Sequence, residues 1–146
     1  MRCLIIIPAY NEAANIEKVV DNLVQNYPQY DYLVINDGST DDTGAVCRKK
    51  HYQYVNLPIN MGIGGAVQTG YCYAKENDYD AAVQIDGDGQ HDVSFLAEML
   101  KVIEEGQADV VIGSRFVEKE GFQSSSLRRI GIRFLSFLGW LLTGIR

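Results

Sequence analysis

Two aspartates separated by a single glycine carry the clearest chemical signal in this sequence. The segment Asp86–Gln90 (Asp-Gly-Asp-Gly-Gln) directly follows the predicted strand 81–85. Two carboxylates so spaced on a turn can present oxygens to one hard cation, while the glycines let the backbone bend and a bulky ligand approach. The pattern therefore predicts an Mg²⁺ or Mn²⁺ site with open positions for diphosphate oxygens. A solvated Asp/Gly turn is the competing interpretation.

Asp37 is the candidate contact for a nucleobase. It comes two residues after the predicted strand 32–35 and precedes Gly38. A carboxylate at the end of a strand can accept hydrogen bonds from the N–H edge of a base. Capping a helix is the alternative role, but residues 40–42 (Thr-Asp-Asp) serve that role better. We therefore interpret Asp37 as a binding residue.

Three further segments carry weaker signals. The Pro8–Glu12 loop (Pro-Ala-Tyr-Asn-Glu) combines a rigid turn, an aromatic face and a carboxylate, which suit a nucleoside. Asn60–Gly65 could bring backbone N–H groups at a helix start close to phosphate, although it lacks the Lys-Ser/Thr of a Walker loop. Gly113–Arg115 adds one permanent cation, for which a structural salt bridge is the alternative. His91, beside the acidic segment, is a weaker candidate for contact with the metal or phosphate.

Alternating strands and helices must position these segments. Strands are predicted at 3–7, 32–35, 54–57, 81–85 and 109–112, and helices at about 13–26, up to about 50, 62–76 and about 94–105. This alternation predicts a single α/β domain with a mostly parallel, Rossmann-like sheet flanked by helices. Ligands of such sheets bind beyond the carboxyl ends of the strands, where the polar segments fall. Their expected convergence on one edge makes the chemical interpretation stronger than any single motif does.

Composition limits the classes of function. Residues 1–126 hold all 19 acidic residues and 9 of the 13 Lys and Arg, for a net charge of −10. Such an acidic body argues against a general nucleic-acid binder, because phosphate contacts need a basic face. Three scattered cysteines suit reduced thiols in the cytoplasm better than a disulfide framework. The apolar start is too short for a signal peptide, and no run of about 18 apolar residues predicts a membrane span.

Residues 127–146 differ sharply from the body of the chain. They hold four arginines and no acidic residue, for a net charge of +4, and several Phe and Leu residues and the single Trp follow Arg128 and Arg129. One interpretation is an interfacial helix near anionic lipid, peripheral at the cytoplasmic membrane. Packing on another part of the protein is the other. We therefore divide the chain into a ligand-binding domain, 1–126, and a basic, apolar helical segment, 127–146.

Taken together, five motifs resemble the family 2 glycosyltransferases, and within them the dolichyl- or polyprenyl-phosphate mannose and glucose synthases. The motifs occur in order and at suitable spacing: Ile7–Glu12, Val34–Asp41, Asn60–Gly62, Gln84–His91 and Gly113–Arg115. The resemblance implies the glycosyltransferase A fold, a UDP- or GDP-sugar, a divalent metal and inversion at the anomeric carbon. It also implies an enzyme of cell-wall or polysaccharide synthesis that transfers a hexose to a polyprenyl-phosphate-type acceptor.

The resemblance also assigns roles to individual residues. Asp86, Asp88 and Gln90 would hold the metal, Asp88 and Arg115 would serve catalysis, and Arg128 and Arg129 would meet the phosphate of the acceptor. With the local patterns above, the nucleotide-sugar site is predicted to comprise Pro8, Ala9, Tyr10, Glu12, Asp37, Gly38, Asn60, Gly64, Asp86, Gly87 and Arg115.

The chain departs from the family pattern in two places. Asp92 stands where these enzymes more often have Pro. The family's domain also normally continues past a Leu-Thr-Gly such as 142–144 into a region that binds the sugar acceptor, which implies a chain truncated on its C-terminal side. Transfer to a polysaccharide or other glycan, and a non-catalytic nucleotide-sugar-binding module, therefore stay open as alternatives. The general base, the nucleobase, the sugar and self-association into a homo-oligomer are also left open.

Overall fold

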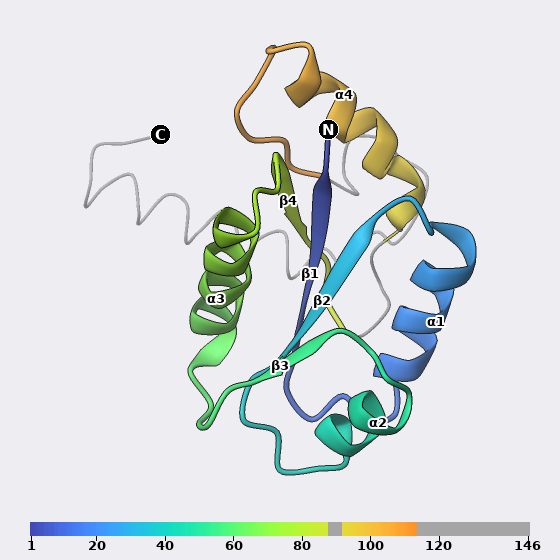
Figure 1. Cartoon of the computed structure of the whole chain (residues 1–146), viewed down its shortest axis with the longest axis vertical. Helices are drawn as coiled ribbons and strands as arrows, with labels where there is room; N and C mark the ends of the chain where they lie inside the picture. Colours follow the sequence, from blue (N-terminus) through green and yellow to red (C-terminus); the bar gives the residue numbers. More distant parts are fainter. Residues whose placement is uncertain (88–91, 114–146) are drawn as a thin grey trace, which may run out of the picture. The chain divides into compact units, whose positions relative to one another are not determined.

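The central strand of the sheet, β1 (Cys3–Ala9), is buried along its whole length. In the computed structural model, which describes residues 1–87 and 92–113, three further strands join it, all parallel. They are β2 (Asp31–Asn36), β3 (Tyr54–Asn56) and β4 (Ala81–Gln84), in the order β3-β2-β1-β4 (Figure 1). The apolar run in β1 reflects this position, because both faces of a parallel sheet are covered.

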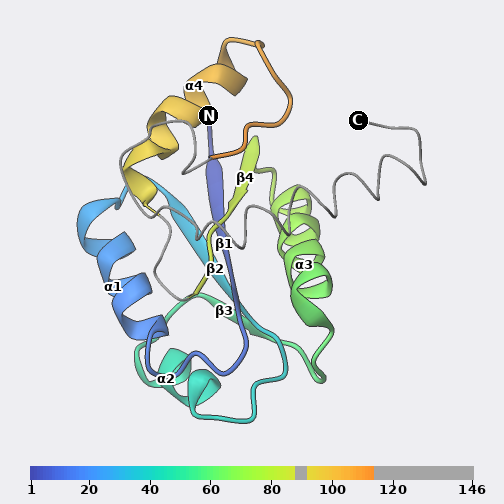
Figure 2. The ribbon, with the colours of Figure 1, turned by 180° about the vertical axis from the view of Figure 1, so that it is seen from behind.

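Helices cover both faces of this sheet, as the opposed views of Figures 1 and 2 show. On one face, Ile5 and Ile7 of β1 pack in a core with α1 (Ile16–Asn26), α2 (Thr43–Lys49) and α4 (Leu96–Glu104). On the other face, Leu4 and Ile6 pack with α3 (Gly62–Glu76). Successive residues of β1 thus enter different cores, because side chains alternate across a strand.

The order of the strands creates a point where the chain reverses direction across the sheet. The chain passes from β1 to β2 to β3 through α1 and α2 on one face, and α3 on the other face returns it past β1 to β4. The reversal therefore falls between β1 and β4. Open α/β sheets bind ligands beyond the carboxyl ends of the strands at such a point.

Most of the predicted elements are confirmed, with shifts of a few residues at their ends. The buried face of α1 is the predicted one: Ile16, Val19, Val20 and Leu23. Asp92 precedes a short 3₁₀ turn (Val93–Phe95) that leads into α4, and its side chain accepts the N–H of Ser94 at 2.9 Å. The three cysteines are free thiols, with Cys3 and Cys47 buried and Cys72 exposed.

The prediction of a fifth strand at residues 109–112 is wrong. Residues 109–112 form no strand, and Val110 and Ile112 are 74% and 84% exposed. An extended segment becomes a strand only when a neighbour satisfies its backbone N–H and C=O groups, and no described strand pairs with this one. The run of three apolar residues at 110–112 favours a strand, but it does not reveal whether a neighbouring strand is present to pair with it.

The chain divides into two compact units, Met1–Val111 and Ile112–Arg146. Only Ile112 and Gly113 of the second unit belong to the described residues. The predicted boundary at 126/127 and the predicted helical segment 127–146 therefore stay predictions. Among the described residues, no helix is long and apolar enough to cross a membrane.

Candidate functional site

Asp37 lies at the carboxyl end of β2 and is held on two sides. Its backbone N–H donates to the carbonyl oxygen of Ala9 at 2.9 Å, which ties it to the end of β1. Its Oδ1 accepts the backbone N–H of Met61 at 2.7 Å, which ties it to the start of α3. Asp37 is only 3% exposed. Because hydrogen bonds hold both its backbone and its side chain, the carboxylate group of Asp37 has a fixed orientation.

Capping of α2 falls to Asp41 rather than to Asp37. Oδ1 of Asp41 accepts the N–H of Thr43 at 2.9 Å and also the Thr43 hydroxyl. Burial alone would raise the pKa of the Asp41 carboxyl, but hydrogen bonds from Thr43 and Ala13 hold that pKa below its usual value. Asp37 therefore does not cap α2, and its side chain instead accepts the N–H of Met61, the residue before α3.

Gly38 lets the segment before α3 approach β2. Its φ is +62°, and a Cβ added to it would lie 2.5 Å from both the carbonyl carbon of Ile59 and the backbone nitrogen of Asn60. No side chain fits such a space without moving the backbone. The side chain of Asn60 in turn accepts the N–H of Gly62 at 2.9 Å at the start of α3. Asn60 thus lies beside Gly38 and Asp37.

Gly64 lies in the first turn of α3, two residues after Gly62. It is exposed, and a Cβ added there would meet nothing within 4 Å. The predicted approach of phosphate to Gly64 therefore has room, but no described residue near it identifies a ligand. Its role stays a prediction.

Gly87 brings the acidic segment after β4 against the loop after β1. It is buried, and a Cβ added there would lie 3.2 Å from the carbonyl oxygen of Pro8 and 3.6 Å from Cγ of Glu12. Asp86 is half-buried, and its Oδ1 accepts Nε2 of Gln84 at 3.2 Å. Asp86 therefore lies beside the reversal point between β1 and β4.

The loop after β1 presents an aromatic face and a carboxylate. Tyr10 is 48% exposed, although it follows the fully buried strand. Oε2 of Glu12 accepts Nδ2 of Asn15 at 2.9 Å. Pro8 and Ala9 belong to the end of β1 rather than to the predicted loop, because both pair with β2. The end of β1 and the described loops gather nine predicted site residues at the carboxyl edge of the sheet: Pro8, Ala9, Tyr10, Glu12, Asp37, Gly38, Asn60, Asp86 and Gly87.

The remaining predicted site residues lie outside the described ranges. They are Asp88, Gln90 and His91 of the acidic segment, Arg115, and Arg128 and Arg129. Within residues 1–87 and 92–113, no group of three or more His, Cys, Asp or Glu is placed to hold a metal. The oxygen ligands of the acidic segment suit Mg²⁺ or Mn²⁺ by their chemistry, and Asp86 at the strand end is the described member of that set.

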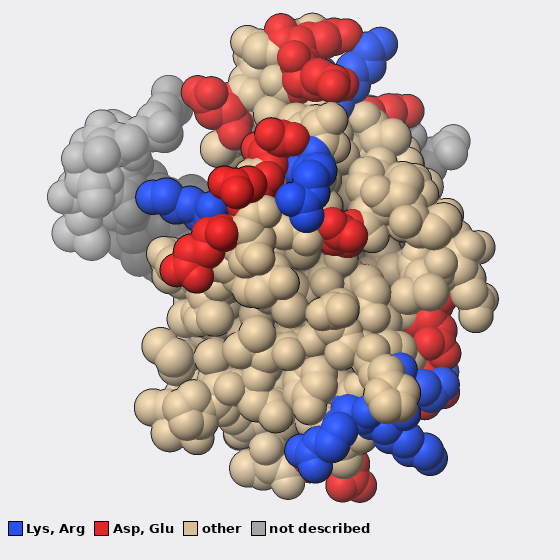
Figure 3. Space-filling view, viewed as in Figure 1, with Lys and Arg blue, Asp and Glu red and all other residues tan. Residues whose placement is uncertain are grey.

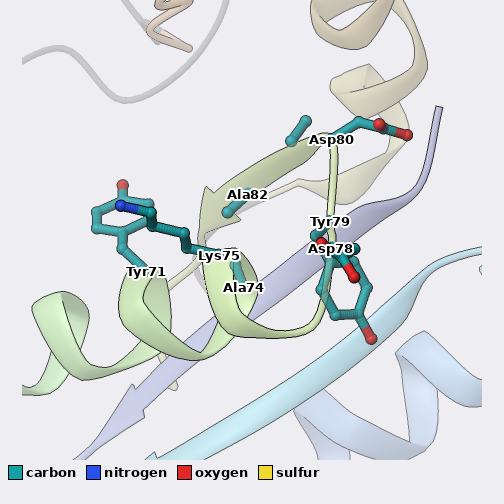
Figure 4. A pocket seen from close by; sticks show the side chains of 8 residues that line it. Tyr71, Ala74, Lys75, Asp78, Tyr79, Asp80 and Ala82 are labelled. Atoms are coloured by element: carbon teal, nitrogen blue, oxygen red, sulfur yellow. The ribbon is translucent and has the colours of Figure 1, made fainter.

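A pocket of about 430 Å³ lies elsewhere, between the end of α3 and the start of β4 (Figure 4). Its lining includes Lys75, Asp78, Ala81 and Ala82. Because β4 begins at Ala81 and Asp86 follows its end, the pocket is at the opposite edge of the sheet from the site. Charged side chains in Figure 3 also gather in separate groups, one on the side of α4 and another near α2.

Sequence reasoning gave no role to Asn11, Ser39 and Thr43, which join the loop after β1 to the loop after β2. The available signal was Asn11 in a loop between a strand and a helix, since Asn tolerates left-handed backbone and bonds to nearby backbone groups. Thr43, which is 0% exposed, gave no pattern that separates it from an ordinary residue of a helix start.

The described chain is thus an α/β protein whose polar loops gather at a reversal point of a parallel sheet. The family described as Glycosyl transferase family 2 matches residues 4–143 of the chain. The chain belongs to this family.

Named relatives agree with the match. The chain is 33% identical to the UDP-N-acetylglucosamine–dolichyl-phosphate N-acetylglucosaminyltransferase of Methanococcus voltae, over 96% of this chain and 62% of that protein. It is 34% identical to the polyprenol monophosphomannose synthase of Mycolicibacterium smegmatis, over 80% of this chain and 46% of that protein. The chain thus spans about half to two thirds of the length of these relatives.

A solved structure confirms the predicted fold. The mannosyltransferase PcManGT from Pyrobaculum calidifontis, in complex with GDP-Man and Mn²⁺, superposes with a TM-score of 0.53 at 27% identity. The match covers 60% of this chain and 27% of that protein. The sheet described above is therefore that of a glycosyltransferase A fold.

Proposed function

We propose that this chain carries the sugar-donor site of a metal-dependent, inverting glycosyltransferase that transfers a hexose from a UDP- or GDP-sugar to a polyprenyl-phosphate-type acceptor. One observation supports this most strongly. The end of β1 and the loop after it meet the loops after β4 and β2, through Gly87 against Pro8 and Glu12 and through the bond from the Asp37 N–H to Ala9. This contact gathers the candidate residues for a nucleoside and a diphosphate at the reversal point of the sheet.

Asp37 and Tyr10 are assigned to the nucleoside. Oδ1 of Asp37 is bonded to Met61, and no described residue donates a hydrogen bond to Oδ2. Oδ2 is thus available to accept an N–H from the edge of a base. The half-exposed ring of Tyr10 offers an apolar face for the same nucleoside.

Asp86, Asp88 and Gln90 are assigned to a divalent metal, Mg²⁺ or Mn²⁺. When bound, such a metal neutralises the negative charge that develops on a diphosphate leaving group. Arg115 adds a second positive charge for the same oxygens. Gly87 lets these residues approach the end of β1 closely, because a Cβ there would lie 3.2 Å from the carbonyl oxygen of Pro8 and the two segments would have to move slightly apart.

The names of the two relatives favour a lipid-phosphate acceptor over a glycan. A phosphate oxygen is already nucleophilic, so this reaction needs no dedicated base on the protein. We assign Arg128 and Arg129 to the phosphate of the acceptor. The reaction would then take place at the surface of the cytoplasmic membrane.

The test is transfer from radiolabelled UDP- and GDP-sugars by the natural protein in membranes that contain polyprenyl phosphate. We expect label in the organic phase after lipid extraction, and none when EDTA is present. Asp86→Ala should abolish this transfer, whereas Asp42→Ala, at an exposed position with no cap hydrogen bond, should leave it unchanged. Label that appears only in water-soluble or insoluble polymer would favour the glycan acceptor, and Asp86→Ala activity within about threefold of wild type would refute the metal assignment.

A further inference from the structure

The side chain of Asn11 joins the two loops that carry Tyr10 and Asp37. Its Oδ1 accepts the N–H of Thr40 at 2.9 Å, the N–H of Asp41 at 3.3 Å and the Thr40 hydroxyl at 3.3 Å. Its backbone has a φ of 57°, in the left-handed region that few residues other than Gly, Asn and Asp adopt readily. The residue is therefore held in an uncommon conformation by bonds to a segment nearly 30 positions away.

The second loop returns bonds to the first through its own side chains. The N–H of Asn11 donates to Oγ of Ser39 at 3.0 Å, and the N–H of Glu12 donates to Oγ1 of Thr43 at 2.9 Å. The N–H of Ala13 donates to Oδ2 of Asp41 at 3.1 Å. Successive N–H groups of the first loop thus each meet a side chain of the second.

These bonds continue the sheet after its backbone pairing has ended. The N–H of Asp37 bonds to the carbonyl oxygen of Ala9, and no described backbone–backbone bond joins the two loops beyond it. From Asn11 onward, side chains hold the loops together in place of the backbone. Tyr10 and Glu12 flank Asn11, so its bonds determine where both lie relative to Asp37.

We propose that Asn11 is a positioning residue for the nucleoside. Through Thr40 and Asp41 it sets the placement of Tyr10 relative to the Asp37 carboxylate, without itself contacting the ligand. This role rests on the proposed function, in which Tyr10 and Asp37 bind the nucleoside. Nothing in it depends on the metal.

Two substitutions separate the hydrogen-bond acceptor of Asn11 from its backbone conformation. Asn11→Gly keeps the left-handed backbone but removes Oδ1. Asn11→Asp keeps both a tolerant backbone and an acceptor oxygen, and salt at about 0.15 M screens its added charge beyond about 8 Å. Asn22→Gly is the matched control, because Asn22 is an exposed residue of α1 and contacts neither loop.

The experiment measures the Kd of UDP and GDP with Mn²⁺ by calorimetry, and amide hydrogen exchange at Thr40 and Asp41. We expect Asn11→Gly to weaken binding by about tenfold or more and to speed exchange at both amides, since lost hydrogen bonds of this kind typically cost that much. Asn11→Asp should recover most of the affinity, and Asn22→Gly should bind as wild type does.

Three results would overturn the role of Asn11. They are binding by Asn11→Gly within about threefold of wild type, equal weakening by Asn22→Gly, and Asn11→Asp binding no better than Asn11→Gly. If the wild-type protein binds neither nucleotide, the proposed function fails, and the role of Asn11 fails with it. Tight wild-type binding that Asn11→Gly leaves intact overturns the role of Asn11 alone.

Discussion

Oδ1 of Asp37 accepts the backbone N–H of Met61 at 2.7 Å, so the end of β2 and the start of α3 are joined through one buried carboxylate. The bond uses one of the two carboxylate oxygens and orients the other. A side chain prepared in this way loses little rotamer freedom when a ligand arrives, which favours tight binding.

Asp37→Asn tests whether the oriented carboxylate of Asp37 binds the nucleobase. The amide oxygen can still accept the Met61 N–H, so we expect only a small change in Tm. The neutral side chain is a weaker acceptor for a base N–H, and we expect the Kd of the nucleotide to rise by about tenfold or more. Calorimetry with UDP and GDP measures the effect. Asp42→Asn, at an exposed position, is the control and should leave the Kd unchanged.

Gly38→Ala should damage both the fold and the site. The added Cβ would lie 2.5 Å from backbone atoms of Ile59 and Asn60, and the φ of +62° disfavours Ala. We expect a loss of about 1–3 kcal/mol in the free energy of unfolding, together with weaker nucleotide binding. Denaturant unfolding measures the first. Gly64→Ala is the control for stability, because its Cβ meets nothing within 4 Å. If Gly38→Ala is as stable as Gly64→Ala, the segment before α3 can move to make room for the added Cβ at little cost in free energy.

A hydrogen bond between two amides, one on the buried Asn36 and one on the exposed Asn56, joins β2 to β3. Nδ2 of Asn36 donates to Oδ1 of Asn56 at 2.7 Å, and Oδ1 of Asn36 is buried without a partner among the described residues. Asn56→Ala removes the acceptor of the Asn36 Nδ2 group and should lower the free energy of unfolding, measured in denaturant, by about 1 kcal/mol. The double variant Asn36→Ala/Asn56→Ala should lose less free energy of unfolding than the two single variants lose in sum. Full additivity would mean that the two amides do not interact.

Asp21 contributes to the loss of folding stability at low pH. The Tyr52 hydroxyl donates to Oδ1 of Asp21 at 2.6 Å, and this bond, with help from Lys50, holds the pKa of Asp21 below its usual value. The pKa of Asp21 in the folded protein is below its value of about 3.9 in the unfolded chain. The stability that Asp21 contributes is therefore fully present above about pH 3.9, and it is lost as the pH falls through the folded-state pKa.

Tyr52→Phe removes this bond and should raise the pKa of Asp21 toward its usual value. NMR titration of the carboxyl group measures the change directly. Tyr79→Phe is the matched control, because the Tyr79 hydroxyl donates to Asp31 instead. An Asp21 pKa that stays low in Tyr52→Phe would assign the shift to Lys50.

The parts of the fold that follow from local pattern were predictable. The apolar run of β1 and the periodic apolar face of α1 each report their own burial, and the buried residues match. The convergence of Asp37 and Asp86 on one edge was predictable too, because it depends only on strands being parallel. The segment 109–112 has the same apolar pattern, but strand formation there requires a partner that its own residues do not encode.

The contacts that shape the site were not predictable from the sequence. Asn11 bonds to Thr40 and Asp41, and the pairing depends on the exact register of β1 against β2. The packing of Gly87 on Pro8 depends in the same way on β4 lying beside β1. Such contacts arise from tertiary arrangement, where a shift of one residue in register changes every partner.

The central claim is that the loops after β1, β2 and β4 form a site for a nucleoside diphosphate and a divalent metal. Calorimetry of the natural protein with UDP and GDP, in Mn²⁺ and then in EDTA, tests it most directly. We predict binding of at least one nucleotide, weakened by about tenfold or more when EDTA removes the metal and again by Asp37→Asn. No binding of either nucleotide in Mn²⁺, or equal binding in EDTA and by Asp37→Asn, would contradict the claim.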